Sequence, residues 1–351
     1  MNSLKFFLFP IALIYKLIVQ LRNIFFNIGI KRQHKFNIPI ISVGNLSVGG
    51  TGKTPHVEYL ISLLKDKYKI AVISRGYKRK TKGFIVANNT HTYKDIGDEP
   101  KQYQEKFGEE ILVSVSSKRV KAIKILLQDY PEIDVILLDD AYQHRYVKPG
   151  LSILLSDYHH PFFKDHILPV GLLREPRKNY KRADIIVITK VPFAFSPIVS
   201  DATIKKIQPY KHQEVYFSCV KHKEPVSVNT SEQVIDNATI CFLVVGIANP
   251  YPLQEHLARS FSEVITIKFP DHHSFSLGDI KKIKSKFNKH FSRKKVIVTT
   301  EKDMMRLNSP EIKKELINLP LFYVPIRTEI NNKKEFNTKI VAYVEKNKRN
   351  S

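Results

Sequence analysis

Ile38-Pro-Ile-Ile-Ser-Val-Gly-Asn-Leu-Ser-Val-Gly-Gly-Thr-Gly-Lys-Thr-Pro55 is an apolar run that enters a glycine-rich turn. We expect a buried strand before the turn and a helix after it. Pro55 would lie in the first helical turn, where a missing N–H breaks no hydrogen bond. The glycines let successive backbone N–H groups point at an anion. This order of strand, turn and helix predicts a phosphate-binding loop.

The turn supplies the groups that hold a nucleotide. Its backbone cradle is formed by Gly49, Gly50, Thr51 and Gly52. Lys53 is expected to reach the β- and γ-phosphates, and the Thr54 hydroxyl to bind Mg²⁺. Ser47 stands where the strict phosphate-loop pattern has glycine, so the alternative is a glycine-rich turn that merely precedes Lys-Thr. The flanking strand and helix favour nucleotide binding.

Composition narrows the class of protein. The 351 residues are enough for about two domains. Cys219 and Cys241 lack the spacing of a metal site or a disulfide framework, which fits a reducing cytoplasm. Lysine and arginine total 57 against 33 acidic residues, a formal net charge of +24. Such an excess predicts an anionic partner: nucleic acid, acidic lipid or a phosphorylated substrate.

The segment 1–34 is predicted to form an amphipathic helix associated with a membrane. It is basic, since no Asp or Glu precedes Glu58, and it is apolar from Phe6 to Tyr15 apart from Pro10. Lys16 ends this run before it can cross a bilayer, which takes about 20 residues. The polar positions at helical spacing are Lys16, Gln20, Asn23 and Asn27. Two alternatives stay open: a helix packed on the protein, and a secretory signal, although no small-residue cleavage site follows.

Strand and helix patterns alternate after residue 34, which is typical of parallel sheets covered on both faces. The predicted fold class is α/β, with two P-loop-like (RecA-like) parallel-sheet domains. The expected strands of the first domain span 40–43, 69–74, 111–115, 135–139, 151–156 and 184–189. The alternation lapses near Val191 and resumes at 240–245. We predict a P-loop domain over 35–195, a linker with short strands over 196–237 and a second α/β domain over 238–351.

Several polar residues follow the ends of expected strands. Asp139 and Asp140 stand where P-loop proteins hold Mg²⁺, whereas the plainer interpretation is a solvated turn capped by Asp. Arg75 follows another strand, where it can bind phosphate or lie in solvent beside a turn glycine. Asp98 precedes a predicted helix and, taken alone, reads as an N-cap.

Two further segments place charged or titratable groups on loops. Arg174 and Glu175 lie between prolines and can face a ligand or form a surface ion pair. Asp271-His-His273 follows another expected strand. Because adjacent side chains on an extended chain diverge, one histidine acting as a base or hydrogen-bond partner is favoured over a metal pair.

Taken in chain order, these motifs resemble those of the tetraacyldisaccharide 4'-kinase family of lipid A assembly. The resemblance extends from near the start of the chain to beyond residue 300. It rests on Val43-Gly-Asn45, Gly49-Gly-Thr-Gly-Lys-Thr-Pro55, Ser74-Arg-Gly-Tyr77, Gly97-Asp-Glu-Pro100, Asp139-Asp-Ala-Tyr-Gln-His144, Leu173-Arg-Glu-Pro176, Arg182-Ala-Asp184, Gly246-Ile-Ala-Asn-Pro250, Asp271-His-His273 and Thr299-Thr-Glu-Lys-Asp303. Ala141 departs from the pattern, which has glycine there, and puts the turn after Asp140 in question.

The resemblance implies a kinase that moves the γ-phosphoryl group of ATP to the 4'-hydroxyl of an acylated glucosamine disaccharide 1-phosphate, forming lipid IVA. ATP and Mg²⁺ are the implied cofactors. The implied partners are this lipid and the anionic surface of the inner membrane on its cytoplasmic face, to which the enzyme would be peripheral; no nucleic acid is expected.

Carried over to this chain, the resemblance makes Lys53 and Thr54 the residues that handle phosphate and metal, with Asp139 and Asp140 supporting the metal. Asp98 becomes the catalytic carboxylate, aided by His272 from the second domain. The implied site is completed by Asn45, Tyr77, Arg75, Arg174, Glu175, Gln143 and His144.

The alternative from another class is a P-loop ATPase that acts on nucleic acid, which the net charge of +24 would suit. Its basic residues would be expected in a patch with exposed aromatics, but here they are spread along the chain. It also leaves the apolar N-terminal segment unexplained. A G-protein-like switch lacks a recognisable N-K-x-D motif, which Thr299-Thr-Glu-Lys-Asp303 only faintly imitates.

Overall fold

The computed structural model describes residues 3–228 and 238–348. Its helices are α1 Ser3–Asn27, α2 Lys53–Leu64, α3 Tyr93–Ile96, α4 Asp98–Phe107, α5 Arg119–Asp129, α6 Pro197–Ile207, α7 Tyr251–Leu257, α8 Leu277–Lys289, α9 Glu301–Leu307, α10 Pro310–Leu316 and α11 Lys333–Lys346. Its strands are β1 Ile40–Asn45, β2 Ile70–Ser74, β3 Ile85–Val86, β4 Ile111–Val115, β5 Val135–Asp139, β6 Leu151–Asp157, β7 Ile185–Thr189, β8 Glu214–His222, β9 Val226–Ser227, β10 Ile240–Val245, β11 Glu263–Lys268, β12 Lys295–Thr300, β13 Leu321–Val324 and β14 Ile326–Ile330.

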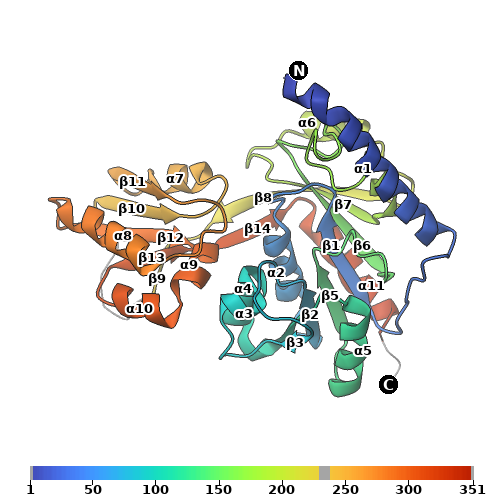
Figure 1. Cartoon of the computed structure of the whole chain (residues 1–351), viewed down its shortest axis with the longest axis horizontal. Coiled ribbons are helices and arrows are strands. Elements are labelled where there is room, and N and C mark those ends of the chain that lie inside the picture. The colour runs from blue at the N-terminus through green and yellow to red at the C-terminus, as the bar shows by residue number, and fades with distance from the viewer. Residues whose placement is uncertain (1–2, 229–237, 349–351) are drawn as a thin grey trace.

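The molecule has two parts, each built around one β-sheet, which we call the larger-sheet part and the smaller-sheet part. Strands β8 and β14 of the larger sheet extend towards the smaller-sheet part (Figure 1). The larger sheet has the order β14-β8-β7-β6-β1-β5-β2-β4-β3, and it is parallel except for its two edge strands. Its central strands are buried on both faces, as the continuous apolar runs of the sequence predict for a parallel sheet. The α/β fold class is therefore confirmed.

Helices cover both faces of the larger sheet, because alternate side chains of each strand point to opposite sides. On one face, Ile41 and Val43 of β1 pack in a core with α2, α4 and α11. On the other, Ile40 of β1 packs with α5. The smaller sheet, of order β11-β10-β12-β13-β9, likewise packs α8, α9 and α10 on one face and α7 on the other.

The predicted boundaries 35–195, 196–237 and 238–351 differ from the arrangement of the sheets. Within the predicted linker, β8 pairs in parallel with β7 and so extends the larger sheet. Helix α6 also lies there; Ser196 caps it and Pro197 occupies its first turn. The chain end was assigned to the second domain, but β14 pairs with β8 and α11 packs in the core of the larger sheet. The packing of α11 on the larger sheet buries Phe336, Ile340 and Val344 against core residues that lie far away in the sequence.

Helix α1 places one narrow face on the protein and a broad apolar face away from it. Ala12, Val19 and Phe26 are buried. The exposed face comprises Phe9, Ile11, Leu13, Ile14, Leu17, Ile18, Leu21, Ile24 and Phe25. The expected polar stripe is divided, since Asn23 and Asn27 contact Arg145 whereas Lys16 is exposed.

Helix α1 is longer than the apolar run that the sequence shows before Lys16. By length and composition alone, Phe7–Asn27 is long and apolar enough to cross a membrane, with 21 residues and a mean hydropathy of 1.5. The sequence analysis counts only the run before Lys16, whereas Lys16 and Arg22 together do little to the average over so long a helix.

Candidate phosphotransfer site

The phosphate-binding loop joins the carboxyl end of β1 to the start of α2, as predicted. Gly49 and Gly52 have φ values of 102° and 83°, in the left-handed region that glycine tolerates best. Lys53 is the first residue of α2. Behind the loop, Asn45 Nδ2 donates to Thr51 Oγ1 at 2.8 Å, and Thr189 Oγ1 donates to the main-chain oxygen of Thr51 at 3.0 Å. Residues at the ends of β1 and β7 thus fix the position of the loop through hydrogen bonds to Thr51.

The two carboxylates that follow β5 differ in environment. Asp139 is buried; burial, with Glu99 and Asp140 nearby, raises its pKa to about 7 despite the charge of Lys53. Its Oδ2 accepts from Ser74 Oγ at 3.1 Å, while its buried Oδ1 has no hydrogen-bond partner within the described part of the chain. The Asp140 carboxylate lies 3.7 Å from Lys53 Nζ.

The turn after Asp140 tolerates the departure at Ala141. Asp140 itself adopts the left-handed conformation, with φ 45°, and Ala141 does not. Ala141 is buried, and its N–H donates to the main-chain oxygen of Val43. The next residue, Tyr142, lies so close to β1 that a Cβ on Gly44 would come within 2.7 Å of its own Cβ. Glycine is therefore required at 44 rather than at 141.

The segment with Arg174 and Glu175 lies beside the phosphate-binding loop. The main-chain N–H of Arg174 donates to Leu46 at 2.7 Å, and that of Val48 donates to Leu172 at 2.8 Å. Arg174 Nη1 is 3.2 Å from both carboxylate oxygens of Asp140 and 3.3 Å from Gln143 Oε1. Arg174 thus contacts Asp140, while Glu175 is buried among other partners.

Asp98 and His272, which are far apart in sequence, meet between the two parts of the molecule. His272 Nδ1 lies 3.0 Å from Asp98 Oδ2. Arg306, a buried residue of α9, donates to the same oxygen through Nε at 3.0 Å and through Nη2. Burial alone would raise the pKa of Asp98, but the hydrogen bonds from His272 and Arg306, with the charge of Arg306, lower it to about 2. Asp98 is therefore ionised.

The tautomer of His272 follows from its other neighbour. Lys302 Nζ is 3.1 Å from His272 Nε2. Because an ammonium group only donates, this contact favours Nε2 as the acceptor and Nδ1 as the donor to Asp98. Arg306 Nη2, which is also a donor, lies 3.1 Å from the same Nδ1. His272 has a φ of 58°, and its N–H donates to the main-chain oxygen of Gly246 at 3.1 Å. A left-handed backbone at a non-glycine residue is a feature of functional sites.

The remaining predicted residues surround these groups. The ring of Tyr77 meets that of His272 edge to face, with centroids 5.7 Å apart. His144 lies near three arginines: burial, followed by the charges of Arg119, Arg22 and Arg75, lowers its pKa to about 4. Neutral at physiological pH, His144 adds a hydrogen-bonding group to the basic side of the site.

The donor set fits Mg²⁺. Within the described residues, the buried Oδ1 of Asp139 has no hydrogen-bond partner, and a bound cation would give it one. Thr54 lies on α2, and Asp140 directly follows β5. Among residues 3–228 and 238–348, no cluster of three or more His, Cys, Asp or Glu side chains forms a metal cage. Mg²⁺ is usually held by one or two carboxylates together with substrate phosphates.

Comparison with known proteins identifies the family. A model of the tetraacyldisaccharide-1-P 4'-kinase family matches residues 4–345. The chain belongs to this family. Tetraacyldisaccharide 4'-kinases from Bacteroides thetaiotaomicron and Flavobacterium psychrophilum are each 43% identical to it, over 98% of this chain and 94% and 98% of their own lengths. Among solved structures, LpxK from Aquifex aeolicus in complex with ATP has a TM-score of 0.74 and 26% identity, covering 97% of this chain and 99% of that one.

Sequence reasoning on this 4'-kinase chain did not single out Arg306, Lys302 or Arg22. Lys302 lies within the motif Thr299-Thr-Glu-Lys-Asp303, and Arg306 follows it by three residues. The family resemblance rests on this motif but assigns no role to either residue. Arg22 lies in the segment 1–34, which the sequence marks only as basic. Its position in the sequence is the signal that could have found it, because Lys16 and Arg22 are the only charged residues of Phe7–Asn27. An arginine in so apolar a helix often forms an ion pair or hydrogen bonds with another part of the protein.

Proposed function

We propose that this ATP-dependent kinase transfers the γ-phosphoryl group of ATP to the 4'-hydroxyl of tetraacyldisaccharide 1-phosphate, forming lipid IVA. The observation that carries the proposal is the meeting of Asp98 and His272 next to a phosphate-binding loop, in a chain that belongs to the 4'-kinase family. Helix α4, which begins at Asp98, packs in one core with α2, which begins at Lys53, and Gln102 of α4 donates to Glu58 of α2 at 2.7 Å. The two helices that carry the acceptor side and the phosphate side are therefore in contact.

The mechanism relies on positioning and charge. Lys53 and the amides of the loop hold the phosphates, and Arg174 and Arg75 neutralise charge on the transferred group. Thr54, Asp139 and Asp140 would hold Mg²⁺, which when bound neutralises phosphate charge. Glu175, expected among the catalytic residues, is enclosed by Arg22, Arg182 and Asn179, so its contacts fit a positioning role.

Asp98 receives the sugar hydroxyl. Within the described residues, every hydrogen bond to the Asp98 carboxylate is made to Oδ2. Oδ1 can therefore accept the hydrogen bond of the substrate hydroxyl. A carboxylate with a pKa of about 2 is a weak base, so it orients the hydroxyl and takes its proton late, when transfer is nearly complete. His272 stays a hydrogen-bond donor to Asp98 through Nδ1 and so orients the carboxylate.

The substrate is a lipid, which suits the exposed apolar face of α1. We infer that the enzyme lies on the cytoplasmic face of the inner membrane as a peripheral protein, with this face among the acyl chains and its basic residues near anionic headgroups. The exposed hydrophobic residues of α1 form an apolar surface of the kind that marks membrane or partner contact.

Thin-layer detection of labelled phosphate, moved from ATP to tetraacyldisaccharide 1-phosphate, tests the function directly. ATP hydrolysis with added DNA and with added RNA should be run beside it. We expect labelled lipid and no nucleic-acid stimulation. A preparation that hydrolyses ATP in response to nucleic acid and labels no lipid would instead make the chain an ATPase of the other class.

A further inference from the structure

A chain of hydrogen bonds through Gln143 and Asn45 connects helix α1 to the phosphate-binding loop. Arg22 Nη2 donates to the main-chain oxygen of Gln143 at 2.8 Å. Gln143 Nε2 donates to the main-chain oxygen of Asn45 at 2.7 Å, and Asn45 Nδ2 donates to Thr51 Oγ1 at 2.8 Å. Thr51 belongs to the phosphate-binding loop. The helix with the exposed apolar face therefore contacts the nucleotide side of the site through Arg22.

The same guanidinium group also holds Glu175. Arg22 Nη2 lies 3.3 Å from Glu175 Oε1, and the Glu175 side chain is only 1% exposed. The other carboxylate oxygen of Glu175 accepts from Arg182 and from Asn179, each at 2.7 Å. Because a buried charge is costly unless it is paired, these donors fix where Glu175 lies. Glu175 follows Arg174 directly, so its placement sets the segment from which Arg174 reaches Asp140.

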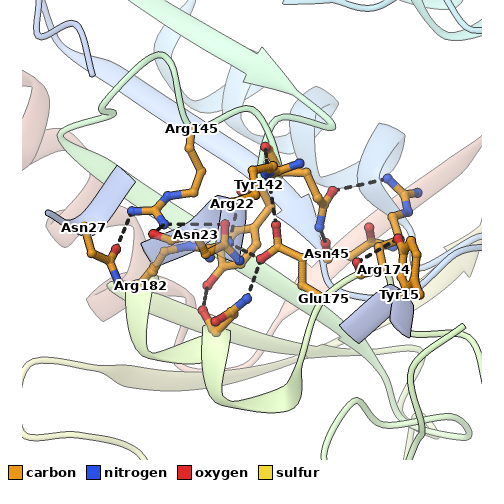
Figure 2. A network of polar contacts seen from close by, with 12 residues as sticks. Tyr15, Arg22, Asn23, Asn27, Asn45, Tyr142, Arg145, Arg174, Glu175 and Arg182 are labelled. Carbon is orange, nitrogen blue, oxygen red and sulfur yellow. Dashed lines mark hydrogen bonds and ion pairs between the residues drawn. The ribbon is translucent and has the colours of Figure 1, made fainter. Parts of the chain in front are cut away.

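A second contact supports the same connection. Tyr15, about two turns before Arg22, donates its hydroxyl to the main-chain oxygen of Arg174 at 3.0 Å. Figure 2 shows Tyr15 beside Arg174 and Arg22 beside Glu175. A helix that served only as an anchor would need no specific hydrogen bonds to the loops of the phosphate site. Those bonds instead hold Gln143, Arg174 and Glu175.

We propose that Arg22 is a positioning residue of the phosphotransfer site: it holds Gln143 and Glu175 and thereby couples the seating of α1 to the geometry of the nucleotide-binding loop. The inference rests on the proposed function. Arginine suits this role because its planar guanidinium can donate at once to a carbonyl and to a carboxylate, whereas lysine is a single point charge. Seating of α1 and nucleotide binding then support each other.

The test compares full-length Arg22→Ala, Arg22→Lys and a matched control, Arg293→Ala, which removes an exposed arginine of the smaller-sheet part. Three quantities are measured: MgATP affinity without lipid, kcat and the KM for ATP on detergent-solubilised tetraacyldisaccharide 1-phosphate, and sedimentation with phosphatidylglycerol vesicles. We expect Arg22→Ala to bind MgATP about tenfold more weakly and to raise the KM for ATP similarly, because the loop is less well positioned. Arg22→Lys should recover part of both losses, and Arg293→Ala should match wild type.

The outcomes separate positioning from anchoring. If Arg22→Ala binds MgATP as wild type does and loses only vesicle sedimentation, Arg22 is an anchor residue and the proposal is overturned. If circular dichroism shows that Arg22→Ala is unfolded, the Arg22→Lys variant provides the test. A wild-type KM for ATP in Arg22→Lys would also overturn the proposal that Arg22 is a positioning residue. Absence of labelled lipid with the wild-type enzyme would count against the proposed function instead, and the MgATP affinities would still test Arg22.

Discussion

At the scale of single residues, the proposed role of Asp98 in orienting the acceptor hydroxyl leads to a prediction about turnover. Asp98→Asn keeps the shape of the side chain but removes the charge that Arg306 and His272 contact. We expect kcat to fall by about 10²–10⁴-fold with little change in MgATP affinity, because the carboxylate serves the acceptor hydroxyl rather than the nucleotide. Single-turnover phosphate transfer and MgATP titration measure the two effects. A variant with wild-type kcat would remove Asp98 from the mechanism.

Arg306, together with His272, lowers the pKa of Asp98, and this leads to a prediction about that pKa. The wild-type pKa of about 2 keeps Asp98 ionised throughout the usual assay range. In Arg306→Lys, a point charge cannot contact Asp98, Asp303 and the Gly246 carbonyl together as the guanidinium does, so the pKa of Asp98 should rise towards its ordinary value.

The pKa of Asp98 in Arg306→Lys, read from an NMR titration of its carboxyl carbon, should accordingly rise by about one unit. The titrations of wild type and of Arg293→Lys, an exposed matched control, provide the reference. A structural role alone would lower stability without moving this pKa. Superimposable titration curves would therefore exclude Arg306 as a group that lowers the pKa of Asp98.

At the scale of elements, the position of a strand in the sequence is easier to predict than the sheet to which it belongs. The run 135–139 was predicted and observed as β5, because a strand buried on both faces must be apolar throughout. The sequence could not show that β14 and α11 return to the larger sheet, since Phe336 and Ile340 would suit either core. The same limit applies to the site. Asp98 and His272 were expected from motifs, whereas Arg306 shows its role only once α9 is seen against α4.

Three elements also meet at a buried charge cluster that sequence gives no hint of. Lys106 of α4 contacts Glu58 of α2 at 2.6 Å and Glu301 of α9 at 2.9 Å. One ammonium group thus serves two carboxylates. Burial, reinforced by Glu301 and opposed by Lys106, raises the pKa of Glu58 to about 7. The folded state therefore retains a proton that the unfolded state, with a Glu pKa near 4.5, releases.

This cluster predicts how stability changes with pH. Stability that depends on protonated Glu58 is present below about pH 4.5 and is lost as pH rises to about 7. Glu58→Gln stays neutral, so its free energy of unfolding relative to wild type should improve by about 1–3 kcal/mol between pH 5 and pH 8. Urea unfolding at both values, with exposed Glu311→Gln as control, measures this. An equal difference at the two pH values would contradict the prediction.

At the scale of the whole molecule, α4 and α9 join its two parts through pairs of opposite polarity. Asp98 of α4 meets Arg306 of α9, and Lys106 of α4 meets Glu301 of α9. Reversing or sliding one helix would bring like charges together, so the two pairs fix one alignment. That alignment is also the one that presents His272 to Asp98. The apposition of the two sheets and the assembly of the site therefore depend on the same contacts.

The membrane surface is the other property of the whole molecule that can be tested. Leu13 and Leu17 are each 57% exposed on the face of α1 that points away from the protein. Leu13→Asp with Leu17→Asp adds two negative charges to that face and removes apolar area, so partition into phosphatidylglycerol vesicles should weaken by at least about tenfold. Vesicle sedimentation measures this. Ile317→Asp, on an equally exposed side chain of the smaller part, is the control and should sediment as wild type does. If the double variant still sediments like wild type, the exposed face of α1 is not the principal membrane contact.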